Sequence, residues 1–248
     1  MSMRAQNEAM RALAYFAAAM LDKARHHPDP AEKRRSQGLL DLLTPVVKGW
    51  CTEQGVEVAS TGIQVHGGMG FIEETGASQY LRDARITTIY EGTTGIQAND
   101  LIGRKVAFEK GATALAVIGA MREIDAQLAA RGQIPASLRV NLNEAVDNLE
   151  AATRWLVETY PQNARAACGV AVPYLKLFGT VAGGWMMARA ALVAQEKLKQ
   201  PDADRDFLQA KLATARFYAE HELPRALPLA REVTRGAESV LALDPGKF

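Results

Sequence analysis

Apolar side chains recur at helical spacing through the first part of the chain. Between residues 4 and 25 they fall three or four positions apart, which places them on one face of a helix. These positions are Ala9, Leu13, Phe16, Ala17, Met20 and Leu21. Pro28 and Pro30 end this pattern, because proline has no backbone N–H and clashes with a preceding helical turn. A second, longer helix is predicted over residues 32–62, and Pro45 is expected to kink it.

Two shorter helices are expected on either side of a loop in the next segment. Thr75 is predicted to cap a helix that carries Tyr80, and another helix is predicted over residues 94–103. A second block of helical patterns then begins after residues 108–111. Its predicted helices span 112–130, 135–160, 163–198 and 204–221.

The helix predicted over residues 163–198 carries small and large apolar residues side by side. The glycines between residues 179 and 184 allow a close approach by another helix. Trp185, Met186 and Met187 are expected to fill the core beside that stretch, whereas Pro224 and Pro228 predict a less regular tail. Helices packed side by side form bundles, so we predict an all-α fold.

Composition agrees with a soluble helical protein. The 248 residues are 48% apolar but only 6% aromatic, and they are enough for one or two domains. The net charge of +1 and the lack of a basic cluster give no support for nucleic-acid binding. Cys51 and Cys168 have no metal-binding spacing, so we expect both to be packing residues in a reducing, cytoplasmic protein.

No membrane span and no secretory signal are predicted. The most apolar stretch, residues 166–194, is interrupted by Pro173, Lys176 and Arg189. A span needs about 20 predominantly apolar residues. The N-terminus also lacks the basic and apolar regions of a signal peptide.

The segment from Gln64 to Gln97 carries the candidate chemistry. Gly67 and Gly68 begin a glycine-rich turn whose backbone N–H groups can approach an anion closely. Glu91 stands between an Ile-Tyr pair and a glycine, so its carboxylate is expected in a tight apolar turn. Desolvation raises the pKa of a carboxylate toward the value that a general base needs. Alone, the glycine run is compatible with an ordinary loop and Glu91 with a solvated turn, but together they indicate a cofactor-dependent enzyme.

These residues resemble the C-terminal helical domain of the acyl-CoA dehydrogenases. That domain carries a Gln-x-x-Gly-Gly-x-Gly element, found at 64–70, and an Ile-Tyr-Glu-Gly-Thr element, found at 89–93 and followed by Ile96 and Gln97. The resemblance implies an FAD enzyme that converts an acyl-CoA thioester to a trans-2-enoyl-CoA. Glu91 matches the base that removes the α-proton, and its backbone N–H matches the donor to the thioester carbonyl.

The resemblance also implies the other site residues. Gln64, Gly67 and Gly68 match the turn that contacts the FAD diphosphate, usually on a neighbouring subunit. A further set matches the stretch that reaches the flavin after the base: Thr93, Thr94 and Gln97. Tyr90 and Gly92 are expected beside the substrate with Glu91.

The family builds its site from an N-terminal helical domain, a middle β-domain and a C-terminal bundle, and we expect the first two to be missing from this chain. Residues 1–105 match the bundle, and residues 106–248 resemble the extra helical domain of the longer branch, which includes the methylmercaptopropionyl-CoA dehydrogenases. The resemblance implies a homo-oligomer, a dimer or a tetramer, and an electron-transfer flavoprotein as the electron acceptor. It leaves the acyl chain and the choice between dehydrogenase and oxidase open.

Two other classes of function remain open. One is a non-catalytic helical fragment that oligomerises with, or regulates, a full-length relative. The other is a DNA-associated relative of the same fold, which the near-neutral charge disfavours. Arg82 and Arg85 are expected to brace the loop by pairing with Glu73, Glu74 or Asp83, in preference to a direct contact with CoA phosphates.

Overall fold

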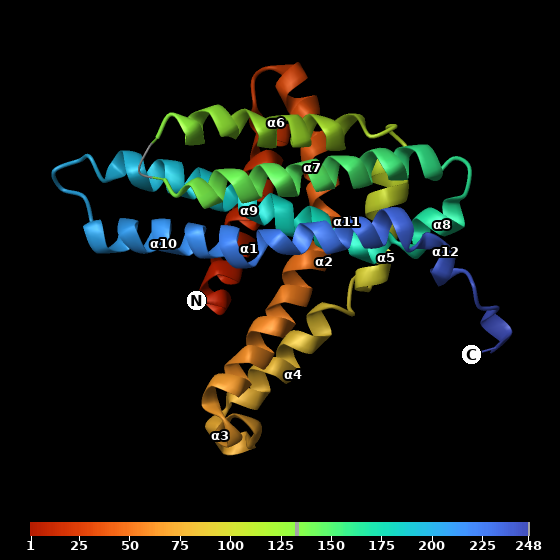
Figure 1. Cartoon of the computed structure of the whole chain (residues 1–248), viewed down its shortest axis with the longest axis horizontal. Helices are drawn as coiled ribbons and strands as arrows, with labels where there is room; N and C mark the ends of the chain where they lie inside the picture. The colour runs from red at the N-terminus through yellow and green to blue at the C-terminus, as the bar shows by residue number, and fades with distance from the viewer. Residues whose placement is uncertain (132–133, 248) are drawn as a thin grey trace.

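The first two helices form a long hairpin that crosses the rest of the molecule (Figure 1). The computed structural model describes residues 1–131 and 134–247, in which α1 spans Ser2–His26 and α2 spans Pro30–His66. Asp29 caps α2 by accepting a hydrogen bond from the Ala31 N–H at 2.9 Å. Pro30 occupies the first helical position, where its missing N–H costs nothing. Both predicted helices are confirmed, and α2 continues past Pro45 to His66.

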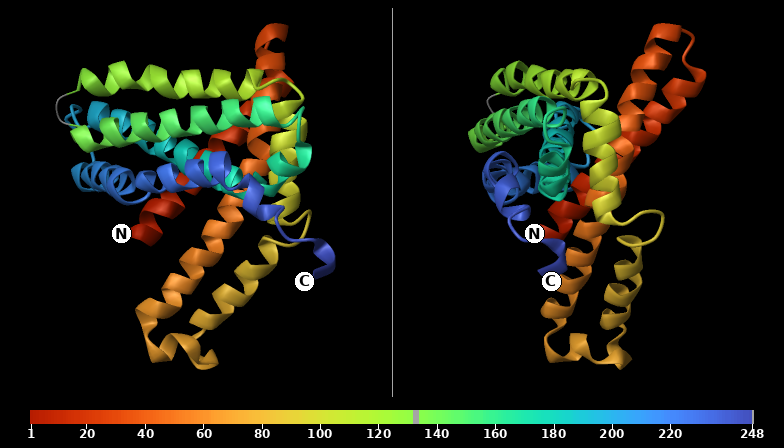
Figure 2. Two further views of the ribbon diagram at one scale, coloured as in Figure 1. Left: turned by 45° about the vertical axis from the view of Figure 1, so that its right-hand side comes forward. Right: turned by 90° about the vertical axis from the view of Figure 1, so that its right-hand side faces the viewer.

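The second half of α2 projects from the bundle together with the short helices that follow it (Figure 2). We call this projection, residues 52–87, the arm. The arm also contains α3 (Gly68–Phe71), η1 (Glu73–Thr75) and α4 (Ala77–Thr87). The chain then returns to the bundle through α5 (Thr94–Asp100) and η2, a π-helix (Leu101–Ala107). The predicted cap at Thr75 is wrong, because its hydroxyl donates to the carbonyls of Met69 and Ile72 at 2.6 and 3.0 Å. Gly76 precedes α4 instead.

The remaining helices form the body of the molecule. They are α6 (Ala112–Ala129), α7 (Ala136–Thr159), α8 (Ala164–Gly169), α9 (Ala171–Lys197), α10 (Arg205–His221), η3 (Leu223–Arg225), α11 (Ala226–Arg235), α12 (Ala237–Val240) and η4 (Pro245–Lys247). The described residues contain no β-strand, so the all-α prediction is confirmed.

Two expectations about this block are corrected. The single helix predicted over 163–198 is broken at Val170, because the ring of Pro173 excludes the carbonyl of Gly169 from a continuous helix. The tail is more regular than predicted, since α11 accommodates Pro228 in its first turn, where no helical N–H is needed.

Helix α9 is the centre of the core. It packs against α1, α2, α5, α6, α7, α10 and α11. One hydrophobic cluster runs through the molecule and draws on both 1–105 and 106–248. The division of the chain into these two domains stays a prediction.

The glycines of α9 admit bulky side chains from neighbouring helices, as the sequence predicted. A Cβ atom at Gly179 would lie 2.2 Å from Cγ of Trp50, and one at Gly183 would lie 2.5 Å from Oη of Tyr218. Trp185, Met186 and Met187 are buried beside them. By length and composition, α9 is also the one described helix that could cross a membrane, but 83% of its most apolar window is buried inside the protein.

The two cysteines differ in their environments. Cys51 packs against the core, and burial raises the pKa of its thiol to about 12. Cys168 is exposed in α8, so the packing role predicted for it is wrong.

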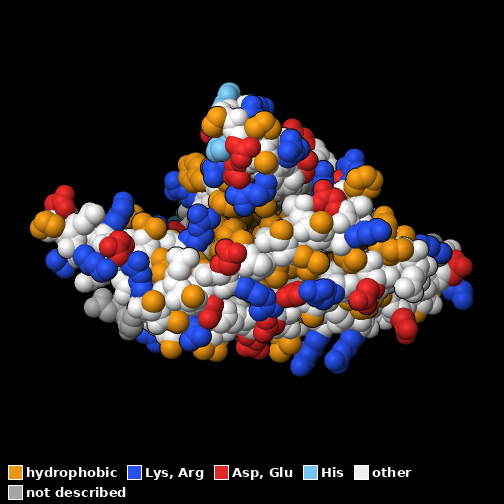
Figure 3. Space-filling model, turned by 90° about the horizontal axis from the view of Figure 1, so that it is seen from above, with side chains coloured by type: hydrophobic (Ala, Val, Ile, Leu, Met, Phe, Trp, Pro, Cys, Tyr) orange, Lys and Arg blue, Asp and Glu red, His pale blue; other side chains and the backbone are white. Residues whose placement is uncertain are grey.

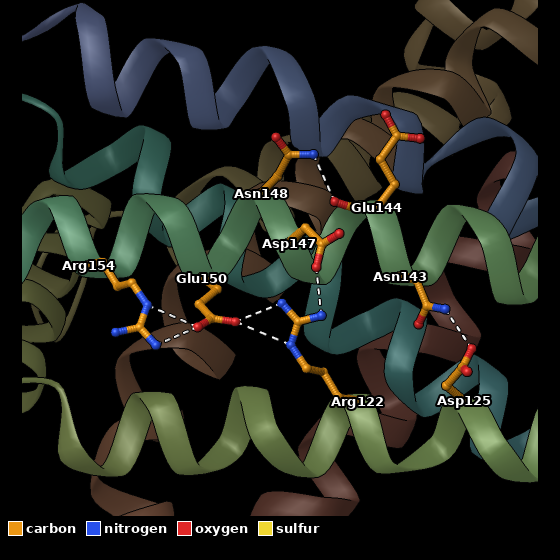
Figure 4. Close-up of polar contacts among 8 residues, drawn as sticks. All are labelled: Arg122, Asp125, Asn143, Glu144, Asp147, Asn148, Glu150 and Arg154. Carbon is orange, nitrogen blue, oxygen red and sulfur yellow. Dashed lines mark hydrogen bonds and ion pairs between the residues drawn. The ribbon is translucent and has the colours of Figure 1, made fainter.

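A row of charged side chains joins α6 to α7 (Figure 4). Arg122 of α6 contacts Glu150 at 2.7 Å and Asp147 at 2.6 Å. Glu150 also accepts from Arg154 at 2.6 Å, one helical turn further along α7. The hydrogen bonds from Arg122 and Arg154 lower the pKa of Glu150 below its ordinary value of 4.5.

Replacing Glu150 with Gln is expected to lower stability at neutral pH but not in acid. The folded pKa of Glu150 is depressed, so its contribution is present above the unfolded pKa and is lost as the pH falls through the folded one. The pair is partly exposed, so the loss at pH 7 should be about 1 kcal/mol or less. Urea unfolding at about pH 7 and about pH 3 measures it. Glu144→Gln on the same helix is the control, and a deficit that stays constant with pH contradicts the assignment.

Candidate functional site

The glycine-rich turn lies at the far tip of the arm, where α2 ends and α3 begins (Figure 1). Gly67 has a φ of +62°, which favours glycine. Its N–H donates to Gln64 O at 3.0 Å, and the Gly70 N–H donates to Gly67 O at 2.9 Å. A Cβ at Gly70 would lie 2.3 Å from Ile63 O, whereas Gly67 and Gly68 face open space. The turn therefore presents an accessible backbone.

Glu91 lies in the loop between α4 and α5, in a backbone conformation rare for its residue type. Its φ is +54°, and the following Gly92 has a φ of +90°. A non-glycine residue with positive φ is strained and persists only where its surroundings fix it. The loop is closed by hydrogen bonds from the Tyr90 N–H to Ile86 O at 3.1 Å and from the Thr94 N–H to Thr88 O at 3.2 Å.

Two side chains of α2 form hydrogen bonds with this loop and with the first residue of α5. Lys48 donates from Nζ to Gly92 O at 2.6 Å, and its ammonium lies 5.7 Å from the centre of the Tyr90 ring. Thr94 donates from Oγ1 to Glu53 at 2.5 Å. Sequence reasoning missed Lys48 and Glu53. They lie 44 and 41 positions from their partners, and neither motif contains them.

Replacing Lys48 with Met is expected to loosen the Glu91 loop. The change keeps the aliphatic stem but removes a charge-assisted hydrogen bond, which is worth about 1.5–3 kcal/mol. We expect faster amide hydrogen exchange at residues 89–93, with the buried helix α9 protected as before. Lys33→Met, near the start of the same helix and 15 residues before Lys48, is the control. Unchanged exchange at 89–93 would show that Lys48 does not hold the loop.

The remaining predicted site residues serve this loop in part. Thr93 caps α5 by accepting from the Ile96 N–H at 3.4 Å, and the Gln97 amide donates to Glu91 O at 3.1 Å. Thr94 is buried, whereas Gln64 at the arm tip is exposed. The arm itself is braced by a hydrogen bond from Arg82 to Glu73 at 3.0 Å, as predicted. The carboxylate partner predicted for Arg85 is wrong, because Arg85 donates to the hydroxyl of Thr88.

The expected apolar enclosure of Glu91 is not formed by this chain. Glu91 is exposed, and the adjacent Ile89 and Tyr90 are themselves 46% and 50% exposed. The apolar neighbours lie on the surface with Glu91 and do not surround it. Burial of the carboxylate would require a further protein surface or a ligand over the loop.

The glycine turn and the Glu91 loop do not meet within one chain. They lie at opposite ends of α4, which has 11 residues and a length of about 16 Å. Two separate groups of candidate residues are therefore present. One is an open backbone turn at the arm tip, and the other is a strained acidic loop at the base of the arm.

Two protein families match the chain over most of its length. Residues 1–107 match the family described as acyl-CoA dehydrogenase, C-terminal domain, and residues 120–244 match that described as acetyl-CoA dehydrogenase C-terminal like. The chain therefore belongs to the acyl-CoA dehydrogenase family.

Individual relatives identify the branch. The chain is 43% identical to 3-methylmercaptopropionyl-CoA dehydrogenase of Ruegeria pomeroyi over 96% of this chain and 40% of that protein. It is 31% identical to the broad-specificity linear acyl-CoA dehydrogenase FadE5 of Mycobacterium tuberculosis over 100% of this chain and 42% of that protein. The chain thus spans about two fifths of the length of these relatives, and it lies in the longer branch that the sequence indicated.

A solved structure supports the fold. The crystal structure of Caenorhabditis elegans ACDH-11 in complex with C11-CoA superposes with a TM-score of 0.69 at 22% identity. The match covers 90% of this chain and 35% of that one. The helical arrangement is therefore that of the family.

Proposed function

We propose that this chain contributes the catalytic base to the α,β-dehydrogenation of an acyl-CoA thioester. One observation carries the proposal: Glu91 presents a carboxylate on a hydrogen-bonded, positive-φ loop, and within the described residues its backbone N–H donates to no acceptor. The same residue thus offers a base and a free donor. Among the described residues, Lys110 is the only other charged residue with a positive φ.

The chemistry needs both groups. The α-proton of a thioester is too weakly acidic for a carboxylate alone, so negative charge developing on the carbonyl oxygen must be stabilised. The free N–H of Glu91 can donate to that oxygen while the carboxylate removes the proton. Lys48 and Gln97 hold the two groups in position, since each bonds a carbonyl of the loop.

The open glycine turn fits the diphosphate of FAD. A Cβ at Gly67 or Gly68 would meet nothing within 4 Å, so an anion can reach the backbone there, beside the exposed Gln64. The separation of this turn from Glu91 favours a contact with the flavin of a second subunit, while Thr93, Thr94 and Gln97 would lie near the chain's own flavin. When bound, FAD would accept the hydride from the β-carbon.

Domain complementation tests the proposal. The chain is fused behind the N-terminal and middle domains of the Ruegeria pomeroyi relative and purified. We expect a yellow homo-oligomer whose flavin absorbance bleaches on addition of 3-methylmercaptopropionyl-CoA or butyryl-CoA. Electron-transfer flavoprotein should reoxidise it. A folded fusion that binds flavin but is not reduced by any acyl-CoA would overturn the proposal.

The alternative is a non-catalytic fragment that oligomerises with, or regulates, a full-length relative. The exposure of Glu91 and of apolar side chains along the arm favours it, since both suit a surface that docks on another chain. A colourless fusion without flavin uptake would support this alternative.

We place the protein in the cytoplasm, and antibody localisation in cell fractions checks that assignment.

A further inference from the structure

Two cavities meet along α9, on a part of the molecule that the proposed reaction does not use. The first, of about 670 Å³, lies between α1, the end of α9 and the start of α10. The second, of about 790 Å³, lies between the α1–α2 hairpin, α6 and α9. Phe16, Arg189 and Val193 line both. We call the combined space the α9 groove.

The walls of the α9 groove are mostly apolar. The aliphatic side chains that line it include Met20, Leu39, Val117, Met186, Leu192 and Leu208. Seen from above, apolar surface bordered by lysine and arginine side chains lies beside the end of the hairpin (Figure 3). Each cavity falls in the range of about 300–1,000 Å³ typical of ligand sites. Such walls suit a hydrocarbon chain.

Arg189 stands where the two cavities join. Its guanidinium lies 5.1 Å from the centre of the Phe16 ring and 5.3 Å from that of the Trp185 ring. Within the described residues it makes no hydrogen bond and no ion pair, whereas the lining residues Arg35 and Lys211 contact Glu32 and Glu8, each at 2.9 Å. A guanidinium is a planar, permanently charged donor that matches a carboxylate.

We propose that the α9 groove binds a long-chain carboxylate, with the carboxylate on Arg189 and the alkyl chain along the apolar walls. The unpaired guanidinium would bind the carboxylate of the ligand, and the two adjoining apolar cavities would hold its alkyl chain. Basic residues outnumber acidic ones in the lining: Lys23, Arg34, Arg35, Arg189, Lys197 and Lys211 against Glu109, Glu123, Asp202 and Asp204. The surrounding charge therefore also favours an anion.

Calorimetric titration of the full chain with dodecanoate and with dodecanol tests the site. Dodecanoate is expected to bind with a stoichiometry of one and more tightly than dodecanol. Arg189→Met should weaken dodecanoate binding about tenfold or more while leaving dodecanol binding unchanged, because it removes the charge but keeps the stem. Arg231→Met, at an exposed position of α11, is the matched control.

A steric variant separates the site from an effect on folding. Val193 is 55% exposed and lines both cavities, so Val193→Trp should block the groove without disturbing the core. We expect it to abolish binding while far-ultraviolet circular dichroism stays unchanged. The absence of dodecanoate binding to the folded chain, equal binding of dodecanol, or wild-type affinity in Arg189→Met would each overturn the proposal.

Discussion

Glu91→Gln is expected to slow the reduction of the flavin by acyl-CoA by orders of magnitude while flavin binding is retained. The variant keeps the shape of the side chain and the free backbone N–H but cannot accept the α-proton. A positioned general base contributes about 100- to 10,000-fold, so the rate of flavin bleaching in the fusion protein should fall by that factor. Stopped-flow absorbance under single-turnover conditions measures it. Exchange of the α-proton of butyryl-CoA with deuterated solvent should fall in parallel.

The matched control for this variant is Glu74→Gln. Glu74 is an exposed carboxylate of the arm, in η1, and is not part of the Glu91 loop. Its replacement should leave the bleaching rate and the proton exchange within about twofold of the parent, as expected for a surface substitution. If Glu91→Gln behaved like this control, another group would have to remove the proton, and the fragment hypothesis would gain support.

The helices could be predicted from the sequence where apolar spacing and proline act locally. α1 and α2 follow from the spacing of residues such as Leu13 and Leu42 and from the prolines between them. The π-helix at Leu101–Ala107 could not be predicted, because its pattern of apolar residues is close to that of an α-helix. Pro173 indicated the helix break at Val170, but the continuous apolar residues on both sides favoured a single helix.

The sequence motifs identified the candidate site residues but did not predict their exposure or their contacts. The motif at 89–93 gives Glu91 its identity, and the Ile-Tyr pair beside it suggested an apolar enclosure. Whether such neighbours surround a carboxylate or lie beside it on the surface depends on tertiary contacts, which local sequence does not encode. The support from Lys48 is likewise a contact between α2 and a loop 44 residues later.

Gly179→Ala is expected to cause a large loss of stability. The new Cβ would lie 2.2 Å from Cγ and 2.6 Å from Cβ of Trp50, and Trp50 is itself fully buried between α2 and α9. The ring cannot move away without displacing the core, so the two helices must separate. Overpacking of this kind costs about 1–3 kcal/mol and occasionally more, and we expect the upper end in the free energy of unfolding.

Where space is available, a glycine-to-alanine change should instead stabilise a helix, because alanine has the higher helix propensity. A second glycine variant therefore separates steric overpacking from helix propensity. Gly119 lies on the exposed side of α6 with nothing within 4 Å of an added Cβ, so Gly119→Ala should stabilise the protein by about 0.5–1 kcal/mol. Urea unfolding of both variants gives the comparison. Adding Trp50→Ala removes Cγ and Cδ1 of the tryptophan, two of the three atoms nearest the new methyl group, so the double variant should lose less stability than the sum of the two single variants. If the two glycine variants behave alike, the close packing of α2 on α9 is wrong.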